Sequence, residues 1–180
     1  MIVAWRDFDL LRNILYYQPI PNICELIMVF FSLSSEEAEA LYRSPKIIQG
    51  QPLIRWDNQR GNKQQITLNL STEDGTPLRI RGWCYHNEEV YSYSFSLLFK
   101  DIVLRRWDDS TPHPNPKDKG RKEEINEPHK HFHHPNYRDK KAYATKDIRL
   151  NDANGALIDF LKECNVDLGD LKFQPTLGLI

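Results

Sequence analysis

The chain has 180 residues, of which 27% are charged and 40% hydrophobic, a composition typical of a globular protein rather than a disordered one. With 24 Lys and Arg against 25 Asp and Glu, the net charge is −1, so any contact with nucleic acid must come from a local basic patch. The three cysteines, Cys24, Cys84 and Cys164, are widely spaced, which excludes a disulfide scaffold and favours a reducing, cytoplasmic location. The longest apolar run is too short to span a bilayer, so we expect no membrane contact.

Residues 1–45 are predicted to be an N-terminal helical segment. Residues 1–31 are dense in large apolar side chains, which favours a helical hairpin, although Met28 could equally be the natural start. Ser34 lies three residues before Glu37, the spacing of a capping box, so a further helix is expected to begin there. A Ser-Pro step should end that helix.

Residues 46–165 are predicted to form an α+β domain. From Gln64 onwards, apolar and polar residues alternate, and turn-forming residues interrupt the alternation. This pattern predicts an antiparallel meander with one apolar and one polar face. The predicted strands lie within residues 66–70, 78–84, 91–97 and 102–107. A short strand at 53–56 and an edge strand within 142–150 bring the expected sheet to about four to six strands.

A C-terminal helix should pack against this sheet. Asp152 or Asn154 is expected to cap it, and apolar residues then recur at helical spacing as far as Cys164. Asn165 should end the helix. Residues 166–180 are predicted to be a tail.

Residues 108–136 are predicted to be a long loop, because prolines recur throughout it. Five of the six histidines fall between His113 and His134. Residues 115–149 also carry ten Lys or Arg against six Asp or Glu. A positive region that holds most of the histidines is a candidate functional site.

Part of this histidine-rich loop alternates as a strand would. The alternate histidines from His129 to His133 should then share one face. Phe132 on the other face would pack in the core, which would turn the histidines outward. Asp108 and His113 stand at the start of the loop and could close over the same face.

Two kinds of chemistry fit this cluster. Paired histidines can act as general base and general acid on RNA while an Arg or Lys stabilises the charged transition state, and this needs no cofactor. The candidate catalytic residues are His129, His131, His113 and Asp108. The candidate nucleic-acid-binding residues are Arg106, Lys117, Lys119, Arg121, Lys122 and Lys130. Exposed Trp83 and Trp107 could stack on bases. Alternatively, His129, His131 and Asp108 could bind a transition metal, or the histidines could belong to a surface loop without a function.

Three sequence steps carry a resemblance to a known family. They are Arg106-Trp107-Asp108-Asp109, Pro112-His113-Pro114-Asn115-Pro116 and Pro128-His129-Lys130-His131. Together they resemble the TumE-like proteins, which are proposed toxins of bacterial toxin–antitoxin pairs. A related group of small bacterial proteins has a later step similar to Tyr137-Arg138-Asp139-Lys140-Lys141-Ala142.

The resemblance is specific only from Arg106 to Ala142. It implies a meander with a C-terminal helix and a toxin-like role, and the positions that match are Asp108, His113, His129 and His131. The gap between the histidine clusters is longer here than in the toxin-like members, and the N-terminal third has no counterpart in them.

These observations together predict a toxin-like protein that acts on RNA, as a metal-independent ribonuclease, with an antitoxin or other protein as a further partner. The first alternative is a non-catalytic subunit that binds nucleic acid or a partner in a bacterial defence or mobile-element complex. The second is a metal-binding domain or enzyme.

Overall fold

The computed structural model describes residues 33–50, 53–87, 91–109, 112–116 and 123–174. The predicted N-terminal hairpin, Met28 and Cys24 lie outside the described residues. Residues from Ser34 onwards form one compact unit. The predicted boundary at residue 45 is therefore wrong, because the helix that follows Ser34 belongs to the same unit as the sheet.

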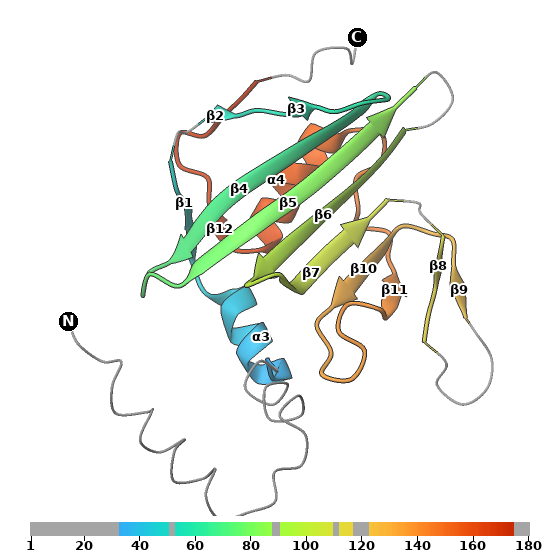
Figure 1. The fold of residues 1–180 in the computed structure, drawn as a ribbon, viewed down its shortest axis with the longest axis horizontal. Helices are drawn as coiled ribbons and strands as arrows, with labels where there is room; N and C mark the ends of the chain where they lie inside the picture. Colours follow the sequence, from blue (N-terminus) through green and yellow to red (C-terminus); the bar gives the residue numbers. More distant parts are fainter. Residues whose placement is uncertain (1–32, 51–52, 88–90, 110–111, 117–122, 175–180) are drawn as a thin grey trace, which may run out of the picture. The chain divides into compact units, whose positions relative to one another are not determined.

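The core of the fold is a nine-stranded, mostly antiparallel sheet (Figure 1). The predicted meander is confirmed as its centre: β4 (Lys63–Thr72), β5 (Pro77–His86), β6 (Tyr91–Phe99) and β7 (Ile102–Asp108). Beyond β7 the sheet continues with β10 (His129–Phe132) and β11 (Ala142–Ala144). Beyond β4 it continues with β1 (Lys46–Ile48) and a parallel strand, β12 (Val166–Asp167). The short β3 (Asp57–Asn58) pairs with the start of β4.

Two small ladders lie outside this sheet. In the first, β2 (Leu53–Ile54) pairs in parallel with β13 (Lys172–Phe173). In the second, β8 (His113–Pro114) pairs with β9 (Glu124–Ile125). Two predictions are thereby corrected. The predicted tail is not a simple one, since its described residues, 166–174, supply β12 and β13. The described part of 108–136 is not simply a loop, because it contains β8, β9 and β10, and Pro114 takes an edge position where no N–H is required.

The two helices of the described chain are α3 (Ser35–Arg43) and α4 (Ala153–Glu163). The predicted capping box is present at α3: the Ser34 hydroxyl accepts from the Glu37 N–H, and the Glu37 carboxylate accepts from the Ser34 N–H. Asp152 caps α4 by accepting from the Gly155 N–H. Neither helix is long and apolar enough to cross a membrane.

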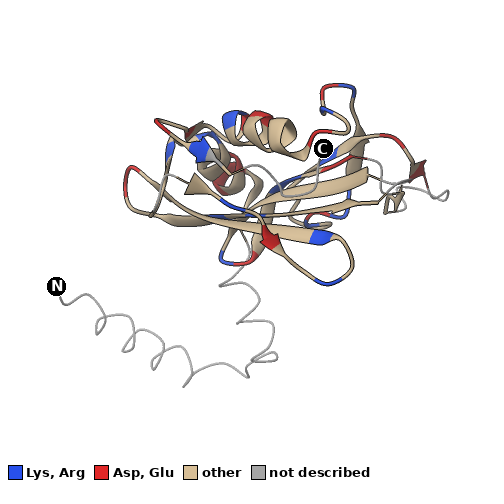
Figure 2. Cartoon of the chain, turned by 90° about the horizontal axis from the view of Figure 1, so that it is seen from above, with Lys and Arg blue, Asp and Glu red and all other residues tan. Residues whose placement is uncertain are grey.

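The helix α4 covers one face of the sheet, as predicted (Figure 2). Its Phe160 ring stacks on Phe95 of β6 at 5.8 Å between ring centroids and meets the edge of Trp107 of β7 at 5.3 Å. Cys84 and Cys164 are buried on this side, as predicted. Trp107 is also buried, so it offers no exposed surface for stacking on bases.

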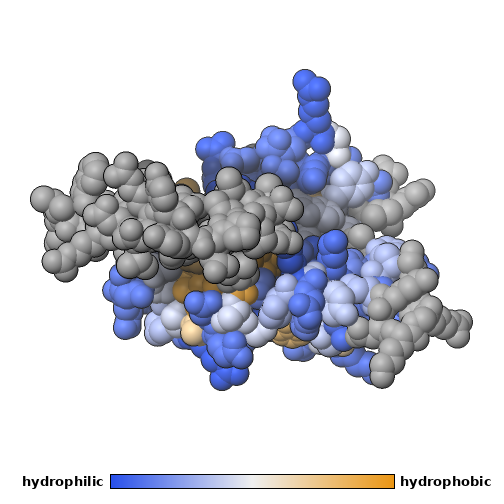
Figure 3. All heavy atoms as spheres, turned by 60° about the horizontal axis from the view of Figure 1, so that its bottom comes forward, coloured by the Kyte–Doolittle hydropathy of each residue, from blue (hydrophilic) through white to orange (hydrophobic). Residues whose placement is uncertain are grey.

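The opposite face of β4 to β7 carries the polar residues of the alternation, including Gln65, Thr67, Arg81 and Arg106. We call this the open face, because no helix of the described residues packs on it. Elsewhere the described surface is mainly hydrophilic, with an apolar patch visible in the view of Figure 3. The sheet thus has one polar face, while α4 closes the core on the other side.

Candidate functional site

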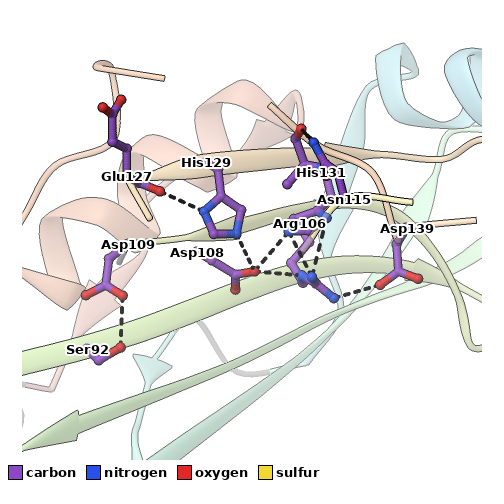
Figure 4. Close-up of polar contacts among 10 residues, drawn as sticks. Ser92, Arg106, Asp108, Asp109, Asn115, Glu127, His129, His131 and Asp139 are labelled. Carbon is purple, nitrogen blue, oxygen red and sulfur yellow. Dashed lines mark hydrogen bonds and ion pairs between the residues drawn. The ribbon is translucent and has the colours of Figure 1, made fainter. Parts of the chain in front are cut away.

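Strand register brings the predicted site residues together at the end of β7. His129 lies opposite Asp108 in the antiparallel pair of β7 and β10, and His131 lies opposite Arg106. Alternation places all four side chains on the open face of the sheet. Asp108 lies 3.1 Å from His131 and 3.4 Å from His129, measured from Oδ2 to each Nε2 (Figure 4). The expected juxtaposition of Asp108, His129 and His131 is therefore present.

The histidines were expected to be exposed, but the structure shows them buried. His129 and His131 are fully buried, because the segment with β8 closes over them. The ring of His113 packs against both, with its centroid 5.8 Å from that of His129 and 4.7 Å from that of His131. His133 does not share this face: it borders a hollow beside α3 together with Phe132, which is half-buried rather than part of the core.

His129 is held in one orientation from both sides. Its Nδ1 lies 2.8 Å from the backbone carbonyl of Glu127. A carbonyl only accepts hydrogen bonds, so Nδ1 carries the proton. The other nitrogen, Nε2, faces the Asp108 carboxylate, which favours a second proton there. Burial lowers the pKa of His129, but the contact with Asp108 outweighs it, and the net effect raises that pKa above its usual value.

His131 is held between two partners with opposite requirements. Its Nε2 lies 2.8 Å from Nη2 of Arg106, which can only donate, and 3.1 Å from Oδ2 of Asp108, which accepts. A proton on this nitrogen is thus favoured by Asp108 and opposed by Arg106.

Arg106 links the site to a later part of the chain. Its Nε donates to Asp108 at 2.9 Å and its Nη1 to Asp139 at 2.7 Å. Asp139 was not predicted as a site residue, although it lies in the step that is similar to one in the related group of small bacterial proteins. Burial would raise the pKa of Asp108, but hydrogen bonds from His129 and His131 and the charge of Arg106 hold that pKa well below its usual range.

Asn115, which was not predicted from the sequence as a site residue, positions His113. The buried Asn115 side chain pairs with the backbone of Ala142 as a strand would: it accepts from the N–H at 2.6 Å and donates to the carbonyl at 2.9 Å. This amide fastens the segment that carries His113 to the edge strand β11. The signal lay in the Pro-His-Pro-Asn-Pro step, where the asparagine follows two residues after the histidine. Burial and the neighbouring charges of His131 and Arg106 lower the pKa of His113, which favours its neutral form.

The site opens onto a groove of about 690 Å³ in the open face. Arg106, Asp108 and His113 line its wall, whereas His129 and His131 lie behind them. Of the two predicted nucleic-acid-binding residues that the structure describes, Arg106 and Lys130, it is Arg106 that lines this groove. Lys130 is on the other face of the sheet, where it forms ion pairs with Asp147 at 2.8 Å and Glu163 at 2.6 Å. The prediction that Lys130 contacts nucleic acid at this site is therefore not supported by its position.

The basic run Lys117, Lys119, Arg121 and Lys122 lies outside the described residues. Its predicted role in binding stays a prediction.

The cluster could also hold a metal ion by the spacing of its ligand atoms. Asp108, His129 and His131 each offer one atom, and these atoms lie within 4.8 Å of one another. Two histidines and a carboxylate are donors that suit a divalent transition metal. However, the Arg106 guanidinium already contacts two of these atoms, on Asp108 and His131, and supplies positive charge there.

Residues 33–166 match the model of a protein family described as a family of unknown function (DUF6978). The chain belongs to this family. The match runs from just before α3 to the start of β12, and it contains the whole cluster. No curated protein and no solved structure matches the chain.

Proposed function

We propose that this member of DUF6978 is a toxin-like ribonuclease that cleaves RNA without a metal ion. The observation that carries the proposal is that a buried carboxylate–histidine–arginine cluster reaches the surface at Arg106, Asp108 and His113, on the wall of an open polar groove. The similarity of these same sequence steps to the TumE-like toxins supports the toxin-like role.

The cluster contains the groups that such a reaction needs. His113 is half-buried, lines the groove and has a lowered pKa, so it suits the general base that removes the proton of a ribose 2′-hydroxyl. The 2′-oxygen then attacks the phosphorus, and the bond to the 5′-oxygen breaks. Arg106 is placed to stabilise the additional negative charge on the phosphate, since a guanidinium can donate two parallel hydrogen bonds to it.

His131 suits the general acid that protonates the leaving 5′-oxygen. The Asp108 carboxylate favours a proton on Nε2 of His131, and the His131 ring contacts the His113 ring. In this proposal Asp108 and His129 are positioning residues: the aspartate orients both imidazoles, and His129 supports the aspartate from behind. The predicted pair of His129 and His131 is thus replaced by His113 and His131, because His113 lines the groove and the His131 ring lies nearer to His113 than the His129 ring does.

A metal-dependent reaction is the second candidate, and the spacing of Asp108, His129 and His131 is the observation in its favour. The position of Arg106 favours the metal-free alternative, because a cation bound by Asp108 and His131 would have to displace the guanidinium or be repelled by it. Cleavage measured with and without a chelator distinguishes the metal-free reaction from the metal-dependent one.

The test is cleavage of single-stranded RNA by the purified protein in excess EDTA. We expect cleavage with 2′,3′-cyclic phosphate ends, and a loss of about 10²- to 10⁴-fold in rate in His113→Ala and His131→Ala. His86→Ala is the matched control, because His86 is exposed and lies outside the groove. Cleavage that requires an added divalent ion would replace this proposal by the metal-dependent one.

Expression in bacteria gives a second readout. We expect the intact protein to slow growth, and His113→Ala to relieve the effect. A partner protein acting as an antitoxin would then restore growth by covering the groove. RNA left intact with EDTA and with divalent ions, together with normal growth, would leave the non-catalytic binding subunit as the better account.

A further inference from the structure

The groove extends well beyond the cluster, along two neighbouring cross-strand rows of the sheet. In the first row Trp83, Ser94, Asp108 and His129 lie opposite one another on successive strands. In the second row the same strands contribute Arg81, Ser96, Arg106 and His131. Each row therefore leads from the cluster, across a serine, to a large side chain on β5.

The two serines account for the depth of the groove. Ser94 and Ser96 are small, while the residues on either side of them along each row are large. Their strand lies between β5 and β7, so the hollow separates Arg106 and Asp108 on one wall from Arg81 and Trp83 on the other. Since neighbouring strands are about 4.8 Å apart, the two walls are about 10 Å apart at the backbone, roughly the extent of one nucleotide.

Trp83 presents an aromatic ring in a groove that is lined mostly by polar residues. It is half-buried, it lines the groove, and the Lys63 ammonium lies 5.1 Å from its ring centroid. Core packing does not account for it, since its neighbours Gly82 and Cys84 face α4 while Trp83 faces the groove. An indole ring in such a position can stack on a nucleobase.

The charges beside this ring favour an anion. Arg81 is exposed. Its guanidinium lies 3.9 Å from the Asp101 carboxylate, which forms a closer ion pair with Arg79 at 2.5 Å. Asp108 is the acidic residue in the groove lining, and Arg106 compensates its charge. An aromatic surface flanked by guanidinium groups matches a nucleotide, whose base is flat and whose phosphate is negative.

We propose that Trp83 and Arg81 form a nucleotide subsite for single-stranded RNA, next to the cleavage site. Trp83 stacks on one base, Arg81 binds the phosphate of that nucleotide, and the chain crosses Ser94 and Ser96 so that the following phosphate reaches Arg106 and His113. Because bases within a duplex are already stacked on one another, the subsite selects single strands. This inference rests on the proposed function for its substrate class.

The test measures binding separately from cleavage. A short fluorescein-labelled 2′-O-methyl oligoribonucleotide lacks the attacking hydroxyl, so it binds without being cut, and its affinity is read by fluorescence anisotropy. We expect Trp83→Ala to weaken binding by about 5- to 100-fold and Trp83→Phe to retain most of it. Arg81→Gln should weaken binding and reduce the slope of log affinity against log salt by about 0.7.

Two residues outside the groove provide matched controls. Tyr85→Ala removes an aromatic ring from the same strand and face, and Arg43→Gln removes an exposed guanidinium from α3, but neither residue lines the groove. Both should bind the probe as the unmodified protein does. The duplex form of the probe should bind less well than the single strand.

Equal affinity of Trp83→Ala and the unmodified protein, or equal loss in Tyr85→Ala, would overturn the subsite even if the protein cleaves RNA. Conversely, binding that depends on Trp83 in a protein that leaves RNA uncut would uphold the subsite and reject the proposed cleavage.

Discussion

His129 lies directly opposite Asp108 across β7 and β10, and its Nε2 faces the Asp108 carboxylate at 3.4 Å. The histidine is fully buried, yet the pKa of its ring is raised, because the carboxylate stabilises the imidazolium more than burial destabilises it. The raised pKa of this buried histidine therefore depends mainly on Asp108, with a further contribution from the Glu127 carbonyl.

Replacement of that neighbour should reverse the shift. In Asp108→Asn we expect the pKa of His129 to fall below its usual value, because burial remains while the carboxylate is gone. A raised folded-state pKa contributes stability that is present below about pH 6.5 and is lost as the pH rises through the folded value. The unmodified protein should thus exceed Asp108→Asn in unfolding free energy by more at pH 5.5 than at pH 8.5. NMR titration of His129 and urea unfolding at both pH values test this; an unchanged titration in the variant would contradict it.

Arg106 should be difficult to replace, even by lysine. Its guanidinium contacts Asp108, Asp139 and His131 at once, and a lysine ammonium cannot reproduce that planar geometry. We expect Arg106→Ala to reduce the unfolding free energy by about 3 kcal/mol, because Asp108 loses a charged partner while still buried. Arg106→Lys should recover only part of this. Urea denaturation measures both. Arg43→Ala, which removes one partner of an exposed ion pair, is the control and should change stability little. Full recovery by lysine would show that charge alone matters.

Asn115 should affect activity without contacting the substrate. Its amide is bound to both backbone groups of Ala142, so Asn115→Ala leaves a buried donor and acceptor unsatisfied. We expect a loss of about 2 kcal/mol in unfolding free energy. We also expect slower cleavage, since His113 is two residues away and loses its anchor. Asn115→Asp keeps the acceptor for the Ala142 N–H but loses the donor. Its unfolding free energy and cleavage rate should therefore lie between those of the unmodified protein and Asn115→Ala. Faster hydrogen exchange of the Ala142 N–H in Asn115→Ala would support the anchoring role, and unchanged exchange would reject it.

Gly82 should not tolerate a side chain. A Cβ built on it would lie 2.5 Å from the nearest atom of Phe95, which is opposite it on β6, and 3.0 Å from Ile66 on β4. We therefore expect Gly82→Ala to lower the unfolding free energy by about 1–3 kcal/mol despite the better strand propensity of alanine. Thermal unfolding measures the effect. The double variant with Phe95→Leu should recover part of the loss; if it does not, the cost arises from something other than this contact.

The sequence alone determined the parts of the fold that depend on neighbouring residues. The alternation from Gln64 to Trp107 specified four strands and their two faces, because side chains on a strand repeat every two residues. The capping box specified the start of α3, and the apolar spacing specified α4. The alternation of the histidines also placed His129 and His131 on the same face as Asp108.

The tertiary structure alone decided how these parts meet. The segment that covers the histidines is bound to the sheet edge by Asn115, which pairs with Ala142, 27 residues away. Lys130 forms an ion pair with Glu163, which is 33 residues away on α4. The strand β12 pairs with β1, although more than a hundred residues separate them. Periodicity specifies which face a side chain takes, but not which distant segment covers that face. That choice is made by packing and hydrogen bonding between segments far apart in the sequence, so only the folded chain shows that His113, rather than His129, reaches the groove.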